Sequence, residues 1–303
     1  MLLSQKIKEK LDIAFDVVDE KEVETLALLA QDPGAPYGSF LVDASYMDSI
    51  GDNVKMLIIS PDLREEVKNK APEMGLIITD NPRNLFFRTH NALHEDEDYI
   101  RPRYKTVIGE NCTIHSSAVI AENNVTIGNN VIIEEHVSIK ENSVIGDNSI
   151  IRAGARIGMI DFEFKREGDT IFGVTHMGGV VLGKEVEVQT NSSINKALYP
   201  WDDTIVGDYT KIDDLVHIAH GCKIGKSVMI VAHSGIGGRV EIGDEAWIGF
   251  GSTIRNGISI GKNARVNMGS VVTKSVEDGG EVTGNFAIPH NLFIEQIKKV
   301  RGE

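Results

Sequence analysis

Aliphatic residues recur at every sixth position through the second half of the chain. Counting in sixes from Val206 to Val272 meets twelve residues, and all of them are isoleucine or valine. The same register continues upstream at Leu182, Val188 and Ile194. An earlier block follows the same rule: Ile127, Ile133, Ile139, Ile145, Ile151 and Ile157. An amphipathic helix has a period of 3.6 and a half-buried strand alternates only briefly, so neither explains this spacing.

A second period of eighteen residues is superimposed on the first. Glycine follows the repeat aliphatic at Gly207, Gly225, Gly243 and Gly261. Three hexads therefore form one turn, and each hexad supplies a short strand and a tight corner. Successive turns then stack at the spacing of parallel strands, about 4.8 Å, and the aliphatic side chains form internal ladders. Glycine and asparagine are expected at the corners because both tolerate a positive φ.

The repeat defines the domain organisation. It occupies residues 105–275, which is enough for about nine turns of a parallel β-helix in a mainly β protein. Two segments interrupt it, Met159–Val180 and Lys196–Thr204, and both are expected to leave the coil as loops. Loops on a rigid scaffold often carry substrate contacts, so these two segments are candidates for a site.

Residues 1–104 lack the hexad and alternate between helical spacing and short apolar runs, which predicts a small N-terminal α/β domain. The helical segments are expected at Ile7–Phe15, Leu63–Lys70 and Leu85–Leu93. The strands are expected at Gly38–Val42, Met56–Ser60 and Leu76–Thr79. Residues 276–303 form a tail that leaves the repeat, and a short C-terminal helix is predicted over Leu292–Val300.

Charge and composition exclude several classes of protein. The formal net charge is −14, so a broad basic surface for nucleic acid is not expected, although local basic clusters can still bind a nucleotide or coenzyme A. No apolar run reaches the length of a membrane span or a signal peptide. The two cysteines, Cys112 and Cys222, are too few for a disulfide framework, so a cytoplasmic location is expected.

The chain resembles the UDP-3-O-acylglucosamine N-acyltransferase family from about Lys6 to Leu292. The most specific stretches are Asp202–Gly207, which reads Asp-Asp-Thr-Ile-Val-Gly, and the Ile-Ala-His corner that ends at His220. Spacing alone does not set the hand of a coil, and right-handed crossovers are the rule. The resemblance implies a left-handed parallel β-helix of the hexapeptide-repeat kind. It also implies a homotrimer with active sites in the clefts between neighbouring helices.

The resemblance assigns four site residues. His220 matches the general base, which takes a proton from the attacking amine. Gly238, eighteen residues later on the same corner, matches the glycine whose backbone N–H forms the oxyanion hole. Phe40 and Tyr46 match an aromatic pair that sandwiches uracil, and stacking on uridine or thymidine is therefore expected in the N-terminal domain.

Other readings of these residues stay open. His217 is three residues from His220 and is an alternative base, and Asp213 is a candidate for orienting a histidine. His233 is a candidate structural or substrate-lining residue. Phe40 and Tyr46 are alternatively core residues of their domain.

The chain also departs from the family pattern at three places. Ile258 stands where the family has a second histidine that assists donor binding, and Asp161–Phe164 replaces a Gly-Phe-Gly loop. The helical extension that meets acyl carrier protein in the family has no counterpart before Glu303. These departures favour coenzyme A as the donor, with a short acyl group.

The predicted function is N-acyl transfer from acyl carrier protein or acyl-coenzyme A to the amine of a nucleotide-linked amino sugar, in lipid A or surface-polysaccharide biosynthesis. No permanently bound cofactor and no metal are expected. One alternative is a γ-type carbonic anhydrase with His217, His220 and His233 as zinc ligands. The other is a non-catalytic β-helix used for binding or assembly.

Overall fold

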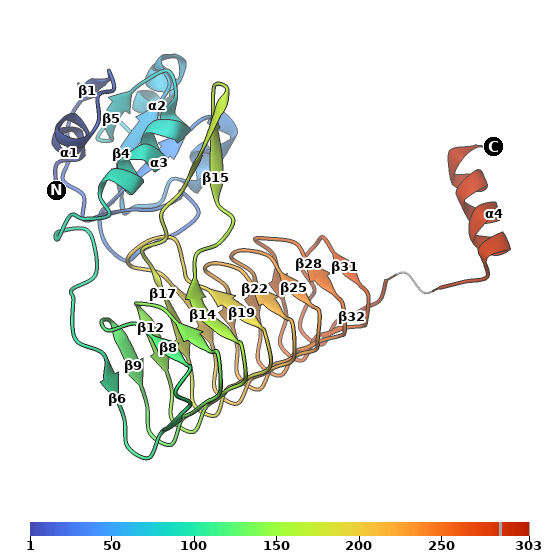
Figure 1. Cartoon of the computed structure of the whole chain (residues 1–303). Helices are drawn as coiled ribbons and strands as arrows, with labels where there is room; N and C mark the ends of the chain where they lie inside the picture. The colour runs from blue at the N-terminus through green and yellow to red at the C-terminus, as the bar shows by residue number, and fades with distance from the viewer. Residues whose placement is uncertain (285–286, 303) are drawn as a thin grey trace.

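The computed structural model describes residues 1–284 and 287–302, which are mainly β-structure. Figure 1 shows an N-terminal domain standing over the first turns of a long β-helix, with α4 (His290–Arg301) set apart beyond the last turn. α4 buries none of its side chains. Among the helices of the described ranges, none has the length and apolar character needed to cross a membrane.

Three parallel sheets make up the β-helix, and each is named here after its first strand. The β6 sheet contains β6 (Val107–Ile108), β9 (Val125–Ile127), β12 (Ser143–Ile145), β17 (Gly179–Leu182), β20 (Asp203–Val206), β23 (Lys223–Ile224), β26 (Glu241–Ile242) and β29 (Ser259–Ile260). The β7 sheet contains β7 (Thr113–Ile114), β10 (Ile132–Ile133), β13 (Ile150–Ile151), β18 (Glu187–Val188), β21 (Lys211–Ile212), β24 (Met229–Ile230), β27 (Trp247–Ile248), β30 (Arg265–Val266) and β32 (Glu281–Val282). The β8 sheet contains β8 (Val119–Ile120), β11 (Ser138–Ile139), β14 (Arg156–Met159), β19 (Ser193–Asn195), β22 (His217–Ile218), β25 (Gly235–Ile236), β28 (Thr253–Ile254) and β31 (Val271–Val272).

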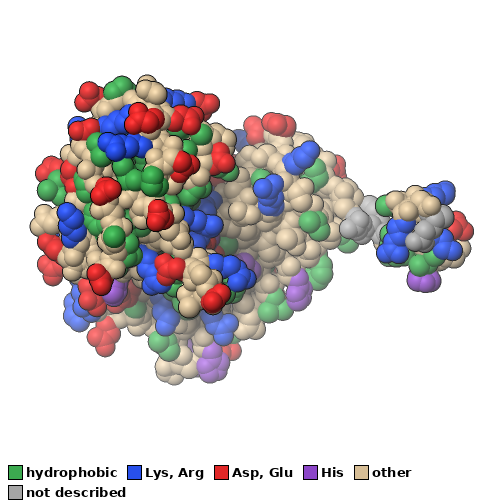
Figure 2. Space-filling model, turned by 90° about the horizontal axis from the view of Figure 1, so that it is seen from above, with side chains coloured by type: hydrophobic (Ala, Val, Ile, Leu, Met, Phe, Trp, Pro, Cys, Tyr) green, Lys and Arg blue, Asp and Glu red, His purple; other side chains and the backbone are tan. Residues whose placement is uncertain are grey.

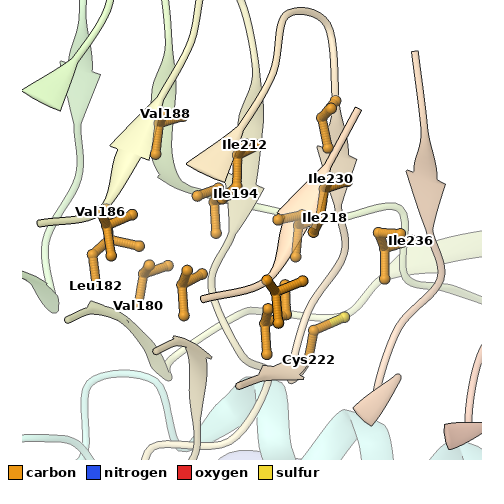
Figure 3. Close-up of a cluster of buried hydrophobic side chains, with 14 of the residues drawn as sticks. Val180, Leu182, Val186, Val188, Ile194, Ile212, Ile218, Cys222, Ile230 and Ile236 are labelled. Atoms are coloured by element: carbon orange, nitrogen blue, oxygen red, sulfur yellow. The ribbon is translucent and has the colours of Figure 1, made fainter. Parts of the chain in front are cut away.

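The aliphatic residue of each hexad points into the coil. Equivalent positions pair turn upon turn, as Ile212 pairs with Ile230 and Ile230 with Ile248. All twelve repeat positions from Val206 to Val272 are buried, and the most exposed of them retains 7% of its surface. Figure 3 shows these side chains converging on the interior of the helix. The predicted left-handed parallel β-helix is confirmed, with three short strands in each turn.

The repeating glycines are required for a different reason from the one that the sequence suggests. None of Gly207, Gly225, Gly243 and Gly261 has a positive φ. A Cβ atom on any of them would instead lie between 2.3 and 2.6 Å from an atom of the next turn. Close stacking of the turns therefore excludes a side chain at these positions. Asparagine does follow the expectation, since Asn130 and several other corner asparagines have φ near +60°.

The helix also continues beyond Ser275, where the hexad pattern ends. β32 pairs in parallel with β30, so that the β7 sheet reaches Val282. Backbone pairing on the last turn is sufficient to extend the sheet without a matching hexad.

The N-terminal domain is a five-stranded sheet in the order β1-β5-β4-β3-β2. Its strands are β1 (Asp16–Val18), β2 (Thr25–Leu26), β3 (Tyr37–Leu41), β4 (Val54–Ile59) and β5 (Gly75–Ile78). Its helices are α1 (Leu3–Lys10), η1 (Ala44–Ser49), η2 (Pro61–Leu63), α2 (Arg64–Lys70) and α3 (Pro82–Ala92). The first helix ends at Lys10 rather than at the expected Phe15, because Asp16–Val18 pairs with β5 and this tertiary pairing overrides the helical spacing.

The first insertion of the β-helix is more ordered than a loop. It contains an antiparallel hairpin, β15 (Phe164–Glu167) and β16 (Thr170–Gly173), which rises beside the N-terminal domain in Figure 1. Asn84 and Asn91 of α3 donate side-chain hydrogen bonds to the carbonyls of Arg166 and Gly173, at 3.0 and 2.8 Å. These contacts hold the hairpin along α3.

Both insertions share a core with the N-terminal domain. Leu198 and Tyr199 of the second insertion are buried in the same cluster as Phe86 of α3. Trp201 donates its indole N–H to the carbonyl of Leu26 at 3.0 Å. The N-terminal domain is therefore fixed to one edge of the β-helix by side chains that interrupt the repeat.

The fully buried His90 joins α3 to the first insertion. Its Nε2 lies 2.8 Å from the carbonyl oxygen of Thr175, and its Nδ1 lies 2.8 Å from the hydroxyl of Tyr99. A carbonyl only accepts, so Nε2 carries the proton and Nδ1 accepts from the tyrosine. Burial lowers the pKa of His90 to about 4, although the hydrogen bond to Thr175 acts in the opposite direction.

An internal ladder position is expected to contribute strongly to stability. Ile254→Ala removes a side chain that is 1% exposed, and the expected loss is about 2–5 kcal/mol in the free energy of unfolding. Thr253→Ala, on the same strand but facing outward, is the matched control and should cost less than about 0.5 kcal/mol. Urea denaturation measures the free energy of unfolding of both variants. Equal losses would contradict a special contribution of the internal ladder to stability.

The low pKa of His90 predicts a loss of stability in mild acid. The unfolded chain takes up a proton near pH 6.5, while the folded chain resists it down to about pH 4. Stability should therefore fall as the pH drops through this window, by on the order of 3 kcal/mol from this group. His90→Gln should flatten the slope of unfolding free energy against pH, and an unchanged slope in that variant would rule this origin out.

Candidate active site

Both insertions and the predicted catalytic corner lie on one edge of the β-helix. At this edge, named the insertion edge, the chain passes from the β8 sheet to the β6 sheet. The insertions follow β14 and β19, and the corners that carry His220 and Gly238 follow β22 and β25. Since these four strands stack in the β8 sheet, the segments that follow them come together although they are far apart in the sequence.

Asp161 of the first insertion accepts two hydrogen bonds from His220. Its Oδ2 accepts both of them, from the backbone N–H of His220 at 2.8 Å and from the ring Nδ1 at 2.7 Å. Burial alone would raise the pKa of Asp161, but the hydrogen bonds from His220 and from the backbone of Phe162 hold it well below its usual value. The carboxylate is therefore ionised and can only accept, so that Nδ1 of His220 is the protonated ring nitrogen.

The remaining ring nitrogen of His220 is a free acceptor. Nε2 is buried and has no hydrogen-bond partner among the described residues. The carboxylate of Glu163 is 3.9 Å from it. A neutral imidazole with a bare Nε2, oriented through Nδ1 by a carboxylate, is the form that a general base requires.

Gly238 lies directly against the His220 ring. A Cβ atom at Gly238 would be 2.7 Å from Cε1 and 2.8 Å from Nε2, so only glycine leaves room for the imidazole. Among residues 1–284 and 287–302, no group accepts a hydrogen bond from the Gly238 N–H, while its neighbours Gly237 and Arg239 both donate to the coil. The structure thus brings the predicted base and the predicted oxyanion donor together.

The other predicted polar residues of this region have different roles. Asp213 accepts from the backbone N–H groups of Asp214 and Ala232, at 2.8 and 3.0 Å, and orients no histidine. His217 is half exposed, with Nε2 3.9 Å from Asp161. His233 is exposed and packs against Phe250. Within the described part of a single chain, no three His, Cys, Asp or Glu side chains are placed to hold a metal ion.

The buried cysteine does not provide a nucleophile. Cys222, next to the catalytic corner, is fully buried and donates to the carbonyl of Gly237 at 3.1 Å. Burial raises the pKa of its thiol to about 12, so the reactive thiolate is not populated near neutral pH.

The predicted nucleobase residues line one pocket of the N-terminal domain. Phe40 on β3 and Tyr46 on η1 border a cavity of about 340 Å³ together with Arg83 at the start of α3. The ring of Phe40 packs on Phe86 with centroids 4.9 Å apart, while Tyr46 is 57% exposed. Phe40 is thus partly a core residue, and Tyr46 is available to a ligand.

A groove leads from this pocket towards the catalytic corner. A second cavity of about 460 Å³ shares Leu28 and Ala30 with the pocket and reaches Gly221, the residue after His220. Its wall includes Arg239, which forms no ion pair with a described residue, and Lys223, which is paired with Asp202 at 2.6 Å.

Asp161 is the main site residue that the sequence pattern did not identify. A signal for it existed, because Asp161–Phe164 is where the chain departs from the Gly-Phe-Gly loop of the resembled family. Spacing could not place it, since it precedes His220 by 59 residues and meets it only after two further turns. Ile258, the other departure, is partly buried against the coil interior and provides no polar group.

Comparison with protein families locates the repeat. The bacterial transferase hexapeptide (six repeats) matches residues 124–158 and 203–238. The hexapeptide repeat of succinyl-transferase matches residues 105–135 and 239–274. Neither covers residues 159–202, which hold both insertions, whereas His220 and Gly238 lie inside the first match.

The sequence relatives of this chain include acyltransferases. UDP-3-O-acylglucosamine N-acyltransferase 2 of Legionella pneumophila (strain Lens) is 37% identical over 148 residues, which cover 49% of this chain and 43% of that protein. UDP-3-O-acylglucosamine N-acyltransferase of Rickettsia akari (strain Hartford) is 43% identical over 93 residues, covering 31% of this chain and 26% of that protein. The matched segments thus span less than half the length of these relatives.

Solved structures show the same fold. UDP-N-acetylglucosamine acyltransferase from Campylobacter jejuni superposes with a TM-score of 0.54 at 25% identity, covering 59% of this chain and 68% of that chain. The corresponding enzyme from Bacteroides fragilis 9343 has a TM-score of 0.50 at 26% identity, covering 59% and 67%. This chain therefore carries the bacterial transferase hexapeptide repeat, and the UDP-3-O-acylglucosamine N-acyltransferases are among its sequence relatives.

Proposed function

We propose that this protein is an N-acyltransferase that moves an acyl group from a thioester donor to the amine of a nucleotide-linked amino sugar. The observation that carries the proposal is the arrangement at His220. Asp161 holds the ring by Nδ1, Nε2 is left as a bare acceptor, and the unused N–H of Gly238 lies beside it. Acyl transfer to an amine needs a base and an oxyanion donor at one place.

The reaction follows from these three groups. Nε2 of His220 accepts a proton from the neutral sugar amine while the amine nitrogen attacks the thioester carbonyl carbon. The carbonyl electrons move to oxygen, and the Gly238 N–H donates to that oxyanion, which is worth on the order of 3 kcal/mol. The C–S bond then breaks as the carbonyl reforms, and the departing sulfur takes the proton from Nε2. Asp161 stabilises the imidazolium between these steps, so it acts as a positioning residue.

The acceptor side of the site fits a nucleotide sugar. A pyrimidine base stacks on Phe40 and Tyr46, and the diphosphate follows the groove past the unpaired Arg239. The sugar then reaches Gly221 and its neighbour His220. We infer a UDP-linked amino sugar on the pathway to lipid A, because the relatives named above are UDP-3-O-acylglucosamine N-acyltransferases.

The donor and the assembly complete the proposal. The acyl group comes from acyl carrier protein or from coenzyme A, and no permanently bound cofactor takes part. The protein acts as a homotrimer, in which the cleft beside the insertion edge is closed by a neighbouring subunit. Two unpaired cysteines, one of them buried, are consistent with a reducing compartment such as the cytoplasm.

Replacing the base and its partner tests the proposal. Purified protein is incubated with UDP- and dTDP-amino sugars and with acetyl-coenzyme A, a longer acyl-coenzyme A or hydroxyacyl carrier protein, and product mass is read. His220→Ala should lower kcat by roughly 10²–10⁴-fold. Asp161→Asn should lower kcat by roughly 10–100-fold with KM nearly unchanged, since only the imidazolium loses its carboxylate.

His217→Ala is the matched control for this experiment, because His217 also faces Asp161 but is half exposed. It should keep nearly full activity. Loss of activity in His217→Ala but not in His220→Ala would move the base to His217. No product from the folded protein with any pair of substrates would refute N-acyl transfer.

Gly238 and the nearby Gly235 on β25 provide a test of the space that the His220 ring requires. Gly238→Ala places a methyl group 2.7 Å from Cε1 of His220, so the ring must shift, and kcat should fall by on the order of 10²-fold. Gly235→Ala adds the same methyl group where no atom lies within 4 Å, and it should leave turnover unchanged. Thermal unfolding confirms that both variants are folded, and equal turnover would contradict the role of Gly238.

A further inference from the structure

A polar cavity separate from the nucleotide groove is lined in part by the first insertion. It has a volume of about 310 Å³ and shares no residue with the two cavities of the proposed acceptor site. It is bounded by the end of the N-terminal domain, by the early corners of the insertion edge and by Thr175–Met177 of the insertion. Figure 2 shows Lys or Arg side chains, interspersed with Asp or Glu, where the N-terminal domain meets the β-helix.

The wall of this cavity is cationic although the protein is acidic. Arg101, Arg103 and Lys196 line it, against a single carboxylate, that of Glu141. Arg101 is committed to Asp203, at 2.8 Å, and to two backbone carbonyls. Arg103 and Lys196 form no ion pair with any described residue.

The charged form of Lys196 is disfavoured by its position in this cavity. Burial is the largest cause that lowers its pKa. The nearby carboxylate of Glu141 raises the pKa, whereas the positive charges of Arg101 and Lys140 lower it further. A partly buried ammonium without a partner is unfavourable unless a ligand supplies the opposite charge. Lys196 therefore indicates that the cavity is built for an anion.

His176 lines the same cavity and packs against the ring of His220. It is 4% exposed, and its Nδ1 lies 3.1 Å from the carbonyl oxygen of Val174. Nδ1 must donate to that carbonyl, so Nε2 is an acceptor, and it is buried with no partner among the described residues. Burial, with the nearby His220, lowers the pKa of His176 to about 4, so the ring is neutral near pH 7.

We propose that this cavity is a second ligand site, which binds a phosphate or a phosphate monoester. Lys196 and Arg103 neutralise the phosphate oxygens, and both side chains line the cavity. The site is distinct from the groove that is proposed for the nucleotide sugar. His176 also packs against the ring of His220, with centroids 5.7 Å apart, so a ligand here lies next to the catalytic base.

Calorimetric titration of the full chain with inorganic phosphate tests the site without acyl donor or sugar. Lys196→Gln and Arg103→Gln should each weaken phosphate binding by roughly tenfold. Lys184→Gln is the matched control, because Lys184 is an exposed lysine of the β-helix that does not line the cavity, and it should bind as the wild type does.

Additional titrations identify which molecule supplies the phosphate group. Additional variants distinguish this cavity from the nucleotide groove. Titration with a sugar 1-phosphate and with coenzyme A shows which molecule supplies the group. Tyr46→Ala and Arg239→Gln should weaken UDP binding but leave phosphate binding intact, and His220→Ala should abolish acyl transfer but leave phosphate binding intact. The proposal is overturned if phosphate does not bind, if Lys196→Gln and Arg103→Gln bind normally, or if Arg239→Gln removes the binding.

Discussion

The return of the chain to the same corner after each turn is the constraint on which the rest of this structure depends. Buried isoleucine and valine ladders hold each strand in register with the strand above and below it. As long as that register is kept, a segment inserted at one corner must emerge beside the segments that leave the neighbouring turns. The rigid coil therefore converts positions that are distant in sequence into an ordered row along the insertion edge.

The polar contacts of the site are built on that row. Asp161 leaves the coil two turns before His220, yet its carboxylate accepts from both the backbone and the ring of that histidine. One turn later, Gly238 keeps the space for the ring free of a side chain. The imidazole is thus fixed from below by a charge-assisted hydrogen bond and from above by close packing, which leaves Nε2 as the only free acceptor of the ring.

The N-terminal domain is held at the same edge by residues that do not belong to the repeat. An aromatic core that includes Tyr199 and Trp201 joins the second insertion to the N-terminal domain. The β15–β16 hairpin of the first insertion is joined to α3 by hydrogen bonds. One edge of the β-helix consequently carries the corners of His220 and Gly238, the groove towards Phe40 and Tyr46, and the cationic cavity around Lys196. His176 of the first insertion lines that cavity and packs against the ring of His220.

The sequence by itself determined the parallel β-helix and its eighteen-residue turn, because burial of one aliphatic residue in six leaves a period that no other regular structure shares. It also located most elements of the N-terminal domain and both interruptions of the coil. Only the tertiary structure decided that Asp161 rather than Asp213 orients His220, that the repeating glycines are required by close stacking, and that the first insertion forms a hairpin. Each of these depends on atoms that meet across turns, and the spacing of residues along the chain does not encode such distances.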